Sequence, residues 1–184
     1  YMPQEHQAEK TRVGAKAAEL LEDNETVFFD CGSTILEMVK AIDPKRRFTC
    51  ITNSLAVADA MCEKPQVEVI LLGGALNVYD KSVTGAMAIS NLKAFHIDRY
   101  CLGAAGISED KGVTGFNLNL IEVRRHVIER CNEVTVIVDA SKFNKTGMAQ
   151  ICSIEEVDKL VTNSDISPET REMLTRYQIE AILA

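Results

Sequence analysis

Short apolar runs recur along the chain and predict a series of buried β-strands. Most are rich in β-branched or aromatic residues and are almost continuously apolar, which is typical of strands covered on both faces. Turn-forming or polar segments separate the runs. They occupy residues 26–31, 47–54, 67–74, 99–106, 133–141, 159–165 and 179–184.

Helical periodicity fills several of the intervals between these runs. Residues 5–21 are expected to form a leading helix with Ala8, Ala15, Ala18 and Leu21 on one face. Apolar residues recur at helical spacing around Ile35–Ile42 and again around Leu120–Ile128. Strand alternating with helix predicts an α/β fold: one domain over residues 1–184, with a mostly parallel sheet covered by helices on both faces.

Two capping signals mark helix starts in the last third of the chain. Ser153 and Glu156 have the spacing of a capping box, in which each side chain accepts a hydrogen bond from the other residue's backbone N–H. Ser167 is followed by Pro168, so a capping hydroxyl precedes a residue whose φ already suits a helix. Both positions predict the entry of a helical segment.

Composition limits the class of protein. With 184 residues and 46% hydrophobic content, the chain is long enough for one core. Apolar runs are too short to span a bilayer and residues 1–10 do not form a signal peptide, so we expect a soluble cytoplasmic protein without a membrane partner. A net charge of −7 with dispersed basic residues argues against direct DNA binding by this chain.

Cysteine and histidine positions give no sign of a metal or a nucleophile. The six cysteines lack a CxxC pair and histidines at ligand spacing, so buried free thiols are expected. The three histidines do not indicate a Ser–His or Cys–His arrangement. We therefore expect no metal, no cofactor and no catalytic residue of these types.

Glycines and hydroxyl residues follow the predicted strands, where ligands bind in open α/β sheets. Backbone N–H groups and hydroxyls at such helix entries suit a phosphate or carboxylate, and Lys142 supplies a point charge. Ordinary helix caps and tight turns are the alternative for each exit, and paired glycines also allow close approach of another backbone. The candidate ligand residues are Asp30, Gly32, Ser33, Thr34, Thr52, Asn53, Ser54, Gly73, Gly74, Gly103, Ala105, Gly106 and Lys142.

Acidic and basic residues near these exits have competing interpretations. Asp30 and Asp139 end apolar runs, where each is expected to cap a backbone turn or to accept a ligand hydroxyl. Glu122 and Arg124 open the helix after residue 120, where a helix-face ion pair is the alternative to a ligand contact. Glu122 and Arg124 complete the candidate site, whereas capping is the favoured role of Asp139.

Several of the same stretches, in the same order, give a family resemblance. "FFDCGST", "TNSLAVA", "VILLGG", "GAAGISEDKGVTGFN", "VTVIVDASKFNK" and "KLVTNSD" resemble the C-terminal sensor domain of DeoR-type bacterial transcriptional repressors, over roughly residues 10–184. The first and fourth stretches are most similar to the deoxyribose branch of that family. The resemblance implies a winged helix-turn-helix DNA-binding domain upstream of residue 1, an effector that is a phosphorylated sugar, and a homo-oligomer.

The resemblance also implies roles for the candidate residues. Gly32, Ser33, Thr34 and Lys142 would hold the charged group of the effector, while Asp30, Asn53 and residues 103–106 would contact hydroxyls. Effector binding would shift the population of the oligomer's arrangements, and the leading helix would pass that bias to the DNA-binding domains.

An enzyme is the rival interpretation, because the family shares its fold with ribose 5-phosphate isomerases and coenzyme A transferases. The isomerases carry an acidic pair where this chain has Gly103 and Ala105, and neither residue can move a proton. Glu122 would be a lone substitute, and the loops offer no glutamate nucleophile for a transferase. We therefore expect an effector-binding domain without enzymatic activity.

Overall fold

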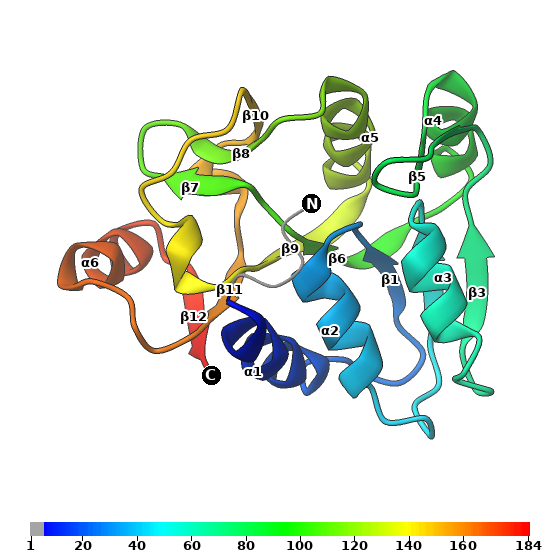
Figure 1. The fold of residues 1–184 in the computed structure, drawn as a ribbon, viewed down its shortest axis with the longest axis horizontal. Helices are drawn as coiled ribbons and strands as arrows, with labels where there is room; N and C mark the ends of the chain where they lie inside the picture. Colours follow the sequence, from blue (N-terminus) through cyan, green and yellow to red (C-terminus); the bar gives the residue numbers. More distant parts are fainter. Residues whose placement is uncertain (1–5) are drawn as a thin grey trace.

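Seven parallel strands form the central sheet in the computed structural model, which describes residues 6–184 (Figure 1). The spatial order is β12-β11-β9-β6-β1-β2-β3, so β6 and β1 lie near the middle. All seven apolar runs contribute one strand each, which confirms the predicted α/β fold. The strands are β1 Thr26–Phe29, β2 Thr49–Thr52, β3 Glu68–Leu71, β6 Ile97–Leu102, β9 Cys131–Ile137, β11 Lys159–Thr162 and β12 Glu180–Leu183.

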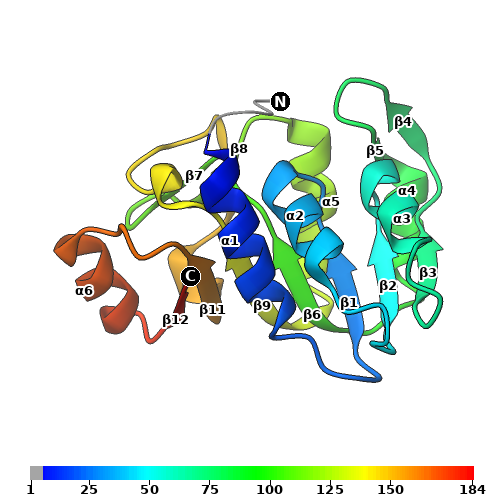
Figure 2. The same ribbon diagram turned by 60° about the horizontal axis from the view of Figure 1, so that its bottom comes forward.

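Helices cover both faces of this sheet. Figure 2 shows the first three helices side by side across one face, with α4 and α5 behind the sheet. Two apolar clusters fill the layers: one lies between the first three helices and the sheet, and the other includes residues of α4, α5 and α6. The helices are α1 Gln7–Ala18, α2 Ser33–Ala41, α3 Leu55–Met61, α4 Ala86–Leu92, α5 Leu118–Ile128 and α6 Pro168–Arg176.

Two small antiparallel sheets extend from the carboxyl ends of the parallel strands. A hairpin of β4 and β5 follows β3, and a three-stranded sheet has the order β10-β8-β7. The apolar pattern did not predict either sheet, because their strands have three or four residues and are rich in glycine and polar residues. Their bounds are β4 Ala75–Asn77, β5 Ser82–Thr84, β7 Gly106–Ser108, β8 Gly112–Gly115 and β10 Ala149–Cys152.

The predicted cap positions are confirmed, although the first begins only a short turn. Ser153 and Glu156 form the capping box of the 3-10 turn η2, Ile154–Glu156. The Ser167 hydroxyl accepts a hydrogen bond from the Thr170 N–H at the start of α6. Both signals therefore mark true helical entries.

The leading helix forms, but the face that packs on the protein is not the face that carries Ala8 and Ala15. Residue 5, where the helix was expected to begin, lies outside the described residues. Ala8 and Ala15 are exposed and Ala18 is half-buried, and only Leu21 of the predicted set is buried, just beyond the helix. The residues of α1 that are buried against α2 and the sheet are Lys10, Val13, Gly14 and Ala17.

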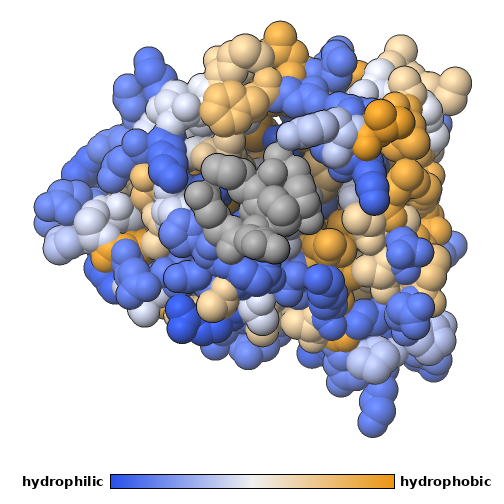
Figure 3. Space-filling view, viewed as in Figure 1, coloured by the Kyte–Doolittle hydropathy of each residue, from blue (hydrophilic) through white to orange (hydrophobic). Residues whose placement is uncertain are grey.

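Exposed apolar side chains gather around one edge of the central sheet. Figure 3 shows apolar residues on the side of the molecule where β3 and α4 lie in Figure 1. Leu71 on β3, Leu76, Val78 and Tyr79 in the hairpin, and Met87 on α4 are all at least 41% exposed. Among the described residues, no helix is long and apolar enough to cross a membrane.

The contact between α1 and α2 depends on Gly14. A Cβ atom built at this position would lie 2.6 Å from the Met38 backbone nitrogen and 2.7 Å from the Glu37 carbonyl carbon. Because both are backbone atoms, the helices would have to separate to accept a side chain. Gly14 therefore sets how closely the leading helix packs on α2.

We predict that Gly14→Val lowers the free energy of unfolding by about 1 to 3 kcal/mol, the usual range for overpacking. Urea unfolding followed by circular dichroism measures it. Ala15→Val is the control, because Ala15 is exposed on the same helix. Helix propensity alone would make Ala15→Val cost about 0.7 kcal/mol or less and Gly14→Val slightly stabilising, so a greater loss for Gly14→Val reports the packing. Equal stability of the two variants would contradict the account of this packing.

Candidate functional site

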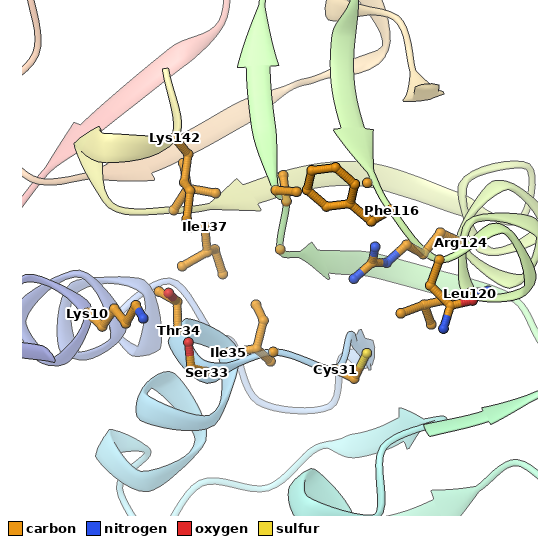
Figure 4. Close-up of a pocket in the computed structure, with 17 residues that line it drawn as sticks. Lys10, Cys31, Ser33, Thr34, Ile35, Phe116, Leu120, Arg124, Ile137 and Lys142 are labelled. Atoms are coloured by element: carbon orange, nitrogen blue, oxygen red, sulfur yellow. Dashed lines mark hydrogen bonds between the residues drawn. The ribbon is translucent and has the colours of Figure 1, made fainter. Parts of the chain in front are cut away.

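A pocket of about 300 Å³ lies where the carboxyl ends of the central strands meet α1, α2 and α5. Figure 4 shows its labelled side chains, which converge from segments far apart in the sequence. The lining residues are Lys10, Cys31, Gly32, Ser33, Thr34, Ile35, Gly103, Ala104, Ala105, Gly115, Phe116, Asn117, Leu120, Arg124, Ile137, Val138 and Lys142.

The amino-terminal end of α2 opens into this pocket without a side-chain cap. Gly32 is the N-cap residue, with a φ of 148° that suits glycine, and no side chain accepts a hydrogen bond from the first turn. The stretch "DCGST" therefore supplies no side-chain cap, and glycine is the N-cap residue. Ser33 and Thr34 begin the helix, so their backbone N–H groups and hydroxyls line the pocket.

Basic side chains approach this helix end from two other elements. Lys10 reaches it from α1 and is only 4% exposed. Lys142 comes from the short turn η1, Ala140–Lys142, which follows β9, and it makes no ion pair within the part of the chain that the structure describes. In Figure 4 both lysines lie on the same side of the pocket as Ser33 and Thr34. This side of the pocket suits an anion.

The opposite side of the pocket contains a buried ion pair. Asp30, which follows β1 and is fully buried, accepts a hydrogen bond from Arg124 Nε at 3.0 Å, and Arg124 Nη2 lies 2.9 Å from Asp30 Oδ2 in the same ion pair. The Gly103 N–H donates a hydrogen bond to Asp30 Oδ2 at 3.1 Å. Asp30 therefore joins the end of β1, the loop after β6 and helix α5.

Protonation within this pair follows from its hydrogen bonds. Burial raises the pKa of Asp30 above its ordinary value, and Arg124 and the Gly103 N–H offset part of this rise. Both carboxylate oxygens accept a hydrogen bond, and the Arg124 guanidinium lies against them, and these contacts favour the charged carboxylate. Burial alone would lower the pKa of Arg124, but Asp30 raises it above its ordinary value. The pair is thus a carboxylate and a guanidinium.

Cys31 lines the pocket as a protonated thiol. Burial, reinforced by the neighbouring Asp30 carboxylate, raises its pKa to about 12. A thiol with this pKa is not a nucleophile at neutral pH. Free thiols were expected, and the six cysteines are all free, although Cys62 is exposed and Cys131 half-buried. Within residues 6–184, no group of three or more His, Cys, Asp or Glu residues could hold a metal ion.

Part of the predicted site is brought together in the pocket. Gly32, Ser33, Thr34, Gly103, Ala105, Arg124 and Lys142 all line it. Asp30 lies directly behind the wall as the partner of Arg124. Asp139 does not line the pocket and caps η1 by accepting a hydrogen bond from the Ser141 N–H at 2.9 Å, which confirms the capping interpretation.

The exits of β2 and β3 lie away from the pocket because the β4–β5 hairpin occupies them. Asn53 donates a side-chain hydrogen bond to the Val83 carbonyl oxygen, and its own backbone pairs with β5. Thr52 donates to the Phe29 carbonyl oxygen, and Ser54 caps α3. These three residues therefore have structural partners and do not line the pocket.

The other predicted glycines, Gly73, Gly74 and Gly106, also have structural contacts and do not line the pocket. A Cβ atom at Gly74 would lie 2.8 Å from the Thr84 carbonyl oxygen, so the close approach is to another backbone. The Gly73 N–H donates a hydrogen bond to Asn91 Oδ1. Gly106 packs against the Lys145 backbone, and Glu122 is exposed on α5 outside the pocket.

Sequence reasoning missed Lys10, Phe116, Asn117 and Leu120. Lys10 was missed because a lysine on an amphipathic helix is expected in solvent, and only the packing of α1 buries it. Phe116 is 66% exposed and lines the pocket. Its position just before a helix was the signal in the sequence that could have placed it at the site. Asn117 caps α5 by accepting a hydrogen bond from the Leu120 N–H at 3.1 Å, which starts that helix at the pocket.

A family of sensor domains matches this chain. The model of the DeoR C-terminal sensor domain matches residues 5–164. The chain therefore belongs to the DeoR C-terminal sensor domain family, in agreement with the resemblance drawn from its motifs.

Relatives of the chain are transcriptional repressors. The chain is 30% identical over 172 residues to the glycerol-3-phosphate regulon repressor of Escherichia coli K12, covering 94% of this chain and 68% of the relative. It is 35% identical over 164 residues to the deoxyribose operon repressor of the same organism, covering 88% of this chain and 63% of the relative. The chain thus spans about two thirds of the length of these repressors.

Solved structures confirm the fold. The probable sor operon regulator of Shigella flexneri has a TM-score of 0.60 at 13% identity, over 92% of this chain and 90% of that one. Ribose 5-phosphate isomerase A of Methanocaldococcus jannaschii has a TM-score of 0.54 at 16% identity, over 73% of this chain and 53% of that one. At these identities the likeness concerns the fold alone.

We predict that Asp30→Asn lowers the free energy of unfolding by about 3 to 5 kcal/mol, because it leaves a buried guanidinium without its counter-charge. Chemical denaturation at pH 7 measures the change. Asp110→Asn is the control, since it alters an exposed pair with Lys111 at 3.8 Å and should change stability by less than about 0.5 kcal/mol. A loss for Asp30→Asn as small as that of the control would show that the pair does not hold this wall together.

Proposed function

We propose that this chain is the effector-binding domain of a sugar-responsive transcriptional repressor and that it binds a phosphorylated sugar in the pocket at the start of α2. A winged helix-turn-helix domain upstream of residue 1 would bind DNA in response. Two relatives support the proposal through their names, since one controls a glycerol-3-phosphate regulon and the other a deoxyribose operon. The cytoplasmic location and the homo-oligomer belong to the same proposal.

The observation that carries the proposal is the charge of the pocket. The chain has a formal net charge of −7, yet Lys10 and Lys142 line the pocket beside the start of α2, and none of the lining residues is acidic. An uncapped helix end adds backbone N–H donors at the same place. A phosphate group would satisfy these donors and charges together.

The rest of the pocket suits the sugar portion of such a ligand. Phe116, with its largely exposed ring, offers an apolar surface to carbon atoms. Gly103 and Ala105 leave space in the loop after β6 rather than filling it with side chains. A small polyhydroxylated ligand needs such space beside a few fixed polar groups.

Binding fits the pocket better than isomerisation does. Moving a proton next to a carbonyl needs a base within hydrogen-bond reach, and the lining residues include no carboxylate. Asp30 is engaged by Arg124 and Gly103, and Glu122 lies outside. The repressor relatives point the same way, while the isomerases share the fold only.

The same geometry offers a route to regulation. Lys10 belongs to α1, the first helix of the chain, and Gly14 packs that helix closely on α2. A phosphate bound at the start of α2 would contact both helices. It would therefore favour one placement of the leading helix, and so one arrangement of the domains upstream.

We predict that a sugar monophosphate raises the melting temperature of the protein. A ligand at one hundred times its dissociation constant contributes about 2.7 kcal/mol, or about 5 to 10 °C for a domain of this size. Thermal unfolding with ribose 5-phosphate, 2-deoxyribose 5-phosphate, fructose 6-phosphate and glycerol 3-phosphate measures the effect.

Lys142→Met should abolish the shift for each monophosphate that gives one, because it removes a charge at the anion end. Lys145→Met is the matched control, since Lys145 is exposed and outside the pocket. No shift with any phosphate in the wild-type protein, or an unchanged shift in Lys142→Met, would contradict the proposed site.

We predict no formation of ribulose 5-phosphate from ribose 5-phosphate, because the pocket lacks a carboxylate base. A coupled assay at neutral pH with concentrated protein measures the turnover. Turnover above the uncatalysed rate that Lys142→Met removes would place an isomerase in this pocket instead of a sensor.

A further inference from the structure

We propose that Arg124 is the specificity-determining residue of the pocket and that it contacts an uncharged oxygen of the bound sugar, at the end opposite the phosphate. This inference rests on the proposed function and adds the class of ligand: a sugar with one phosphate and an uncharged hydroxyl or carbonyl at its other end. Asp30 is the positioning residue that holds Arg124 in place.

One nitrogen of Arg124 remains for a ligand. Asp30 occupies Nε and Nη2, while Nη1 makes no hydrogen bond with any part of residues 6–184. The side chain is only 10% exposed, and its accessible part lines the pocket. A guanidinium fixed through two of its nitrogens presents the third in a defined direction, so a ligand contact there loses little side-chain entropy.

A glycine keeps this nitrogen accessible. A Cβ atom built at Gly115 would lie 3.2 Å from Arg124 Nη1 and 3.4 Å from the Ile121 side chain. A larger residue at position 115 would therefore cover the nitrogen. Gly115 itself lines the pocket, so the space in front of Nη1 belongs to the ligand site.

The two ends of the pocket differ in net charge. The Asp30 carboxylate compensates the Arg124 guanidinium, so that end offers a hydrogen-bond donor with almost no net charge. The other end holds the uncapped start of α2 and Lys142, which makes no ion pair among residues 6–184. Figure 4 shows Arg124 across the pocket from both lysines.

This separation orients the ligand. A phosphate is more stable at the end that carries net positive charge, and a hydroxyl or carbonyl oxygen accepts a hydrogen bond from Nη1 without a second charge. A second anionic group would meet the Asp30 carboxylate directly behind Arg124. We therefore expect sugar bisphosphates to bind no more tightly than the corresponding monophosphates.

Isothermal titration of Arg124→Lys tests the inference, because a lysine ammonium can still pair with Asp30 but has no second nitrogen for the ligand. Affinity for the monophosphates that bind should fall about 10- to 100-fold, the value of one hydrogen bond to a charged group. Affinity for inorganic phosphate should change less than about twofold. Arg125→Lys is the matched control, because Arg125 is exposed and outside the pocket, and it should change neither affinity.

Wild-type protein gives a second readout that does not depend on the stability of a variant. The guanidinium nitrogen signals of Arg124 in an NMR spectrum should shift with ribose 5-phosphate or fructose 6-phosphate and stay in place with inorganic phosphate. Unchanged signals with a monophosphate that binds would overturn the inference.

The outcomes separate this inference from the proposed function. If the wild-type protein binds no phosphorylated sugar, the proposed function fails and this inference fails with it. If a monophosphate binds equally to the wild-type protein and to Arg124→Lys, only the role of Arg124 is overturned. Tenfold tighter binding of fructose 1,6-bisphosphate than of fructose 6-phosphate, lost in Arg124→Lys, would make Arg124 a second anion site and overturn the assigned ligand class.

Discussion

The ion pair between Asp30 and Arg124 is the interaction on which the wall of the pocket depends. Neither charge is stable in the interior alone, so the end of β1 and helix α5 have to meet at a fixed distance. The Gly103 N–H brings the loop after β6 to the same carboxylate. One buried side chain therefore holds together three segments that are far apart in the sequence.

The opposite wall has a different physical origin. There the absence of a capping side chain on α2 leaves backbone donors available, and the close packing at Gly14 lets α1 place Lys10 beside them. The wall of the ion pair is satisfied within the protein, whereas the wall at α2 gains most from an added anion. This contrast is the reason why the proposed phosphate site lies at the wall of α2 although the chain as a whole is acidic.

Sequence patterns predicted the sheet because each buried parallel strand is a nearly continuous apolar run. The same patterns predicted that Gly32, Gly103 and Lys142 lie close together, because each residue follows the carboxyl end of a predicted strand. These three strands are neighbours in the sheet, and all three residues line the pocket. The patterns did not show that the hairpin after β3 occupies the exits of β2 and β3, since its backbone pairing with Asn53 is a tertiary contact. Lys10 was missed for a similar reason: a lysine on an amphipathic helix is expected in solvent, and only the packing of α1 buries it.

A crystal structure of the protein with the sugar monophosphate that most raises its melting temperature tests the central claim most directly. We expect the phosphate at the start of α2, within hydrogen-bond distance of the Ser33 and Thr34 N–H groups and of Lys142. A sugar hydroxyl or carbonyl oxygen should accept a hydrogen bond from Arg124 Nη1. A phosphate bound at Arg124 with the sugar toward the lysines, or a ligand bound outside this pocket, would contradict the account.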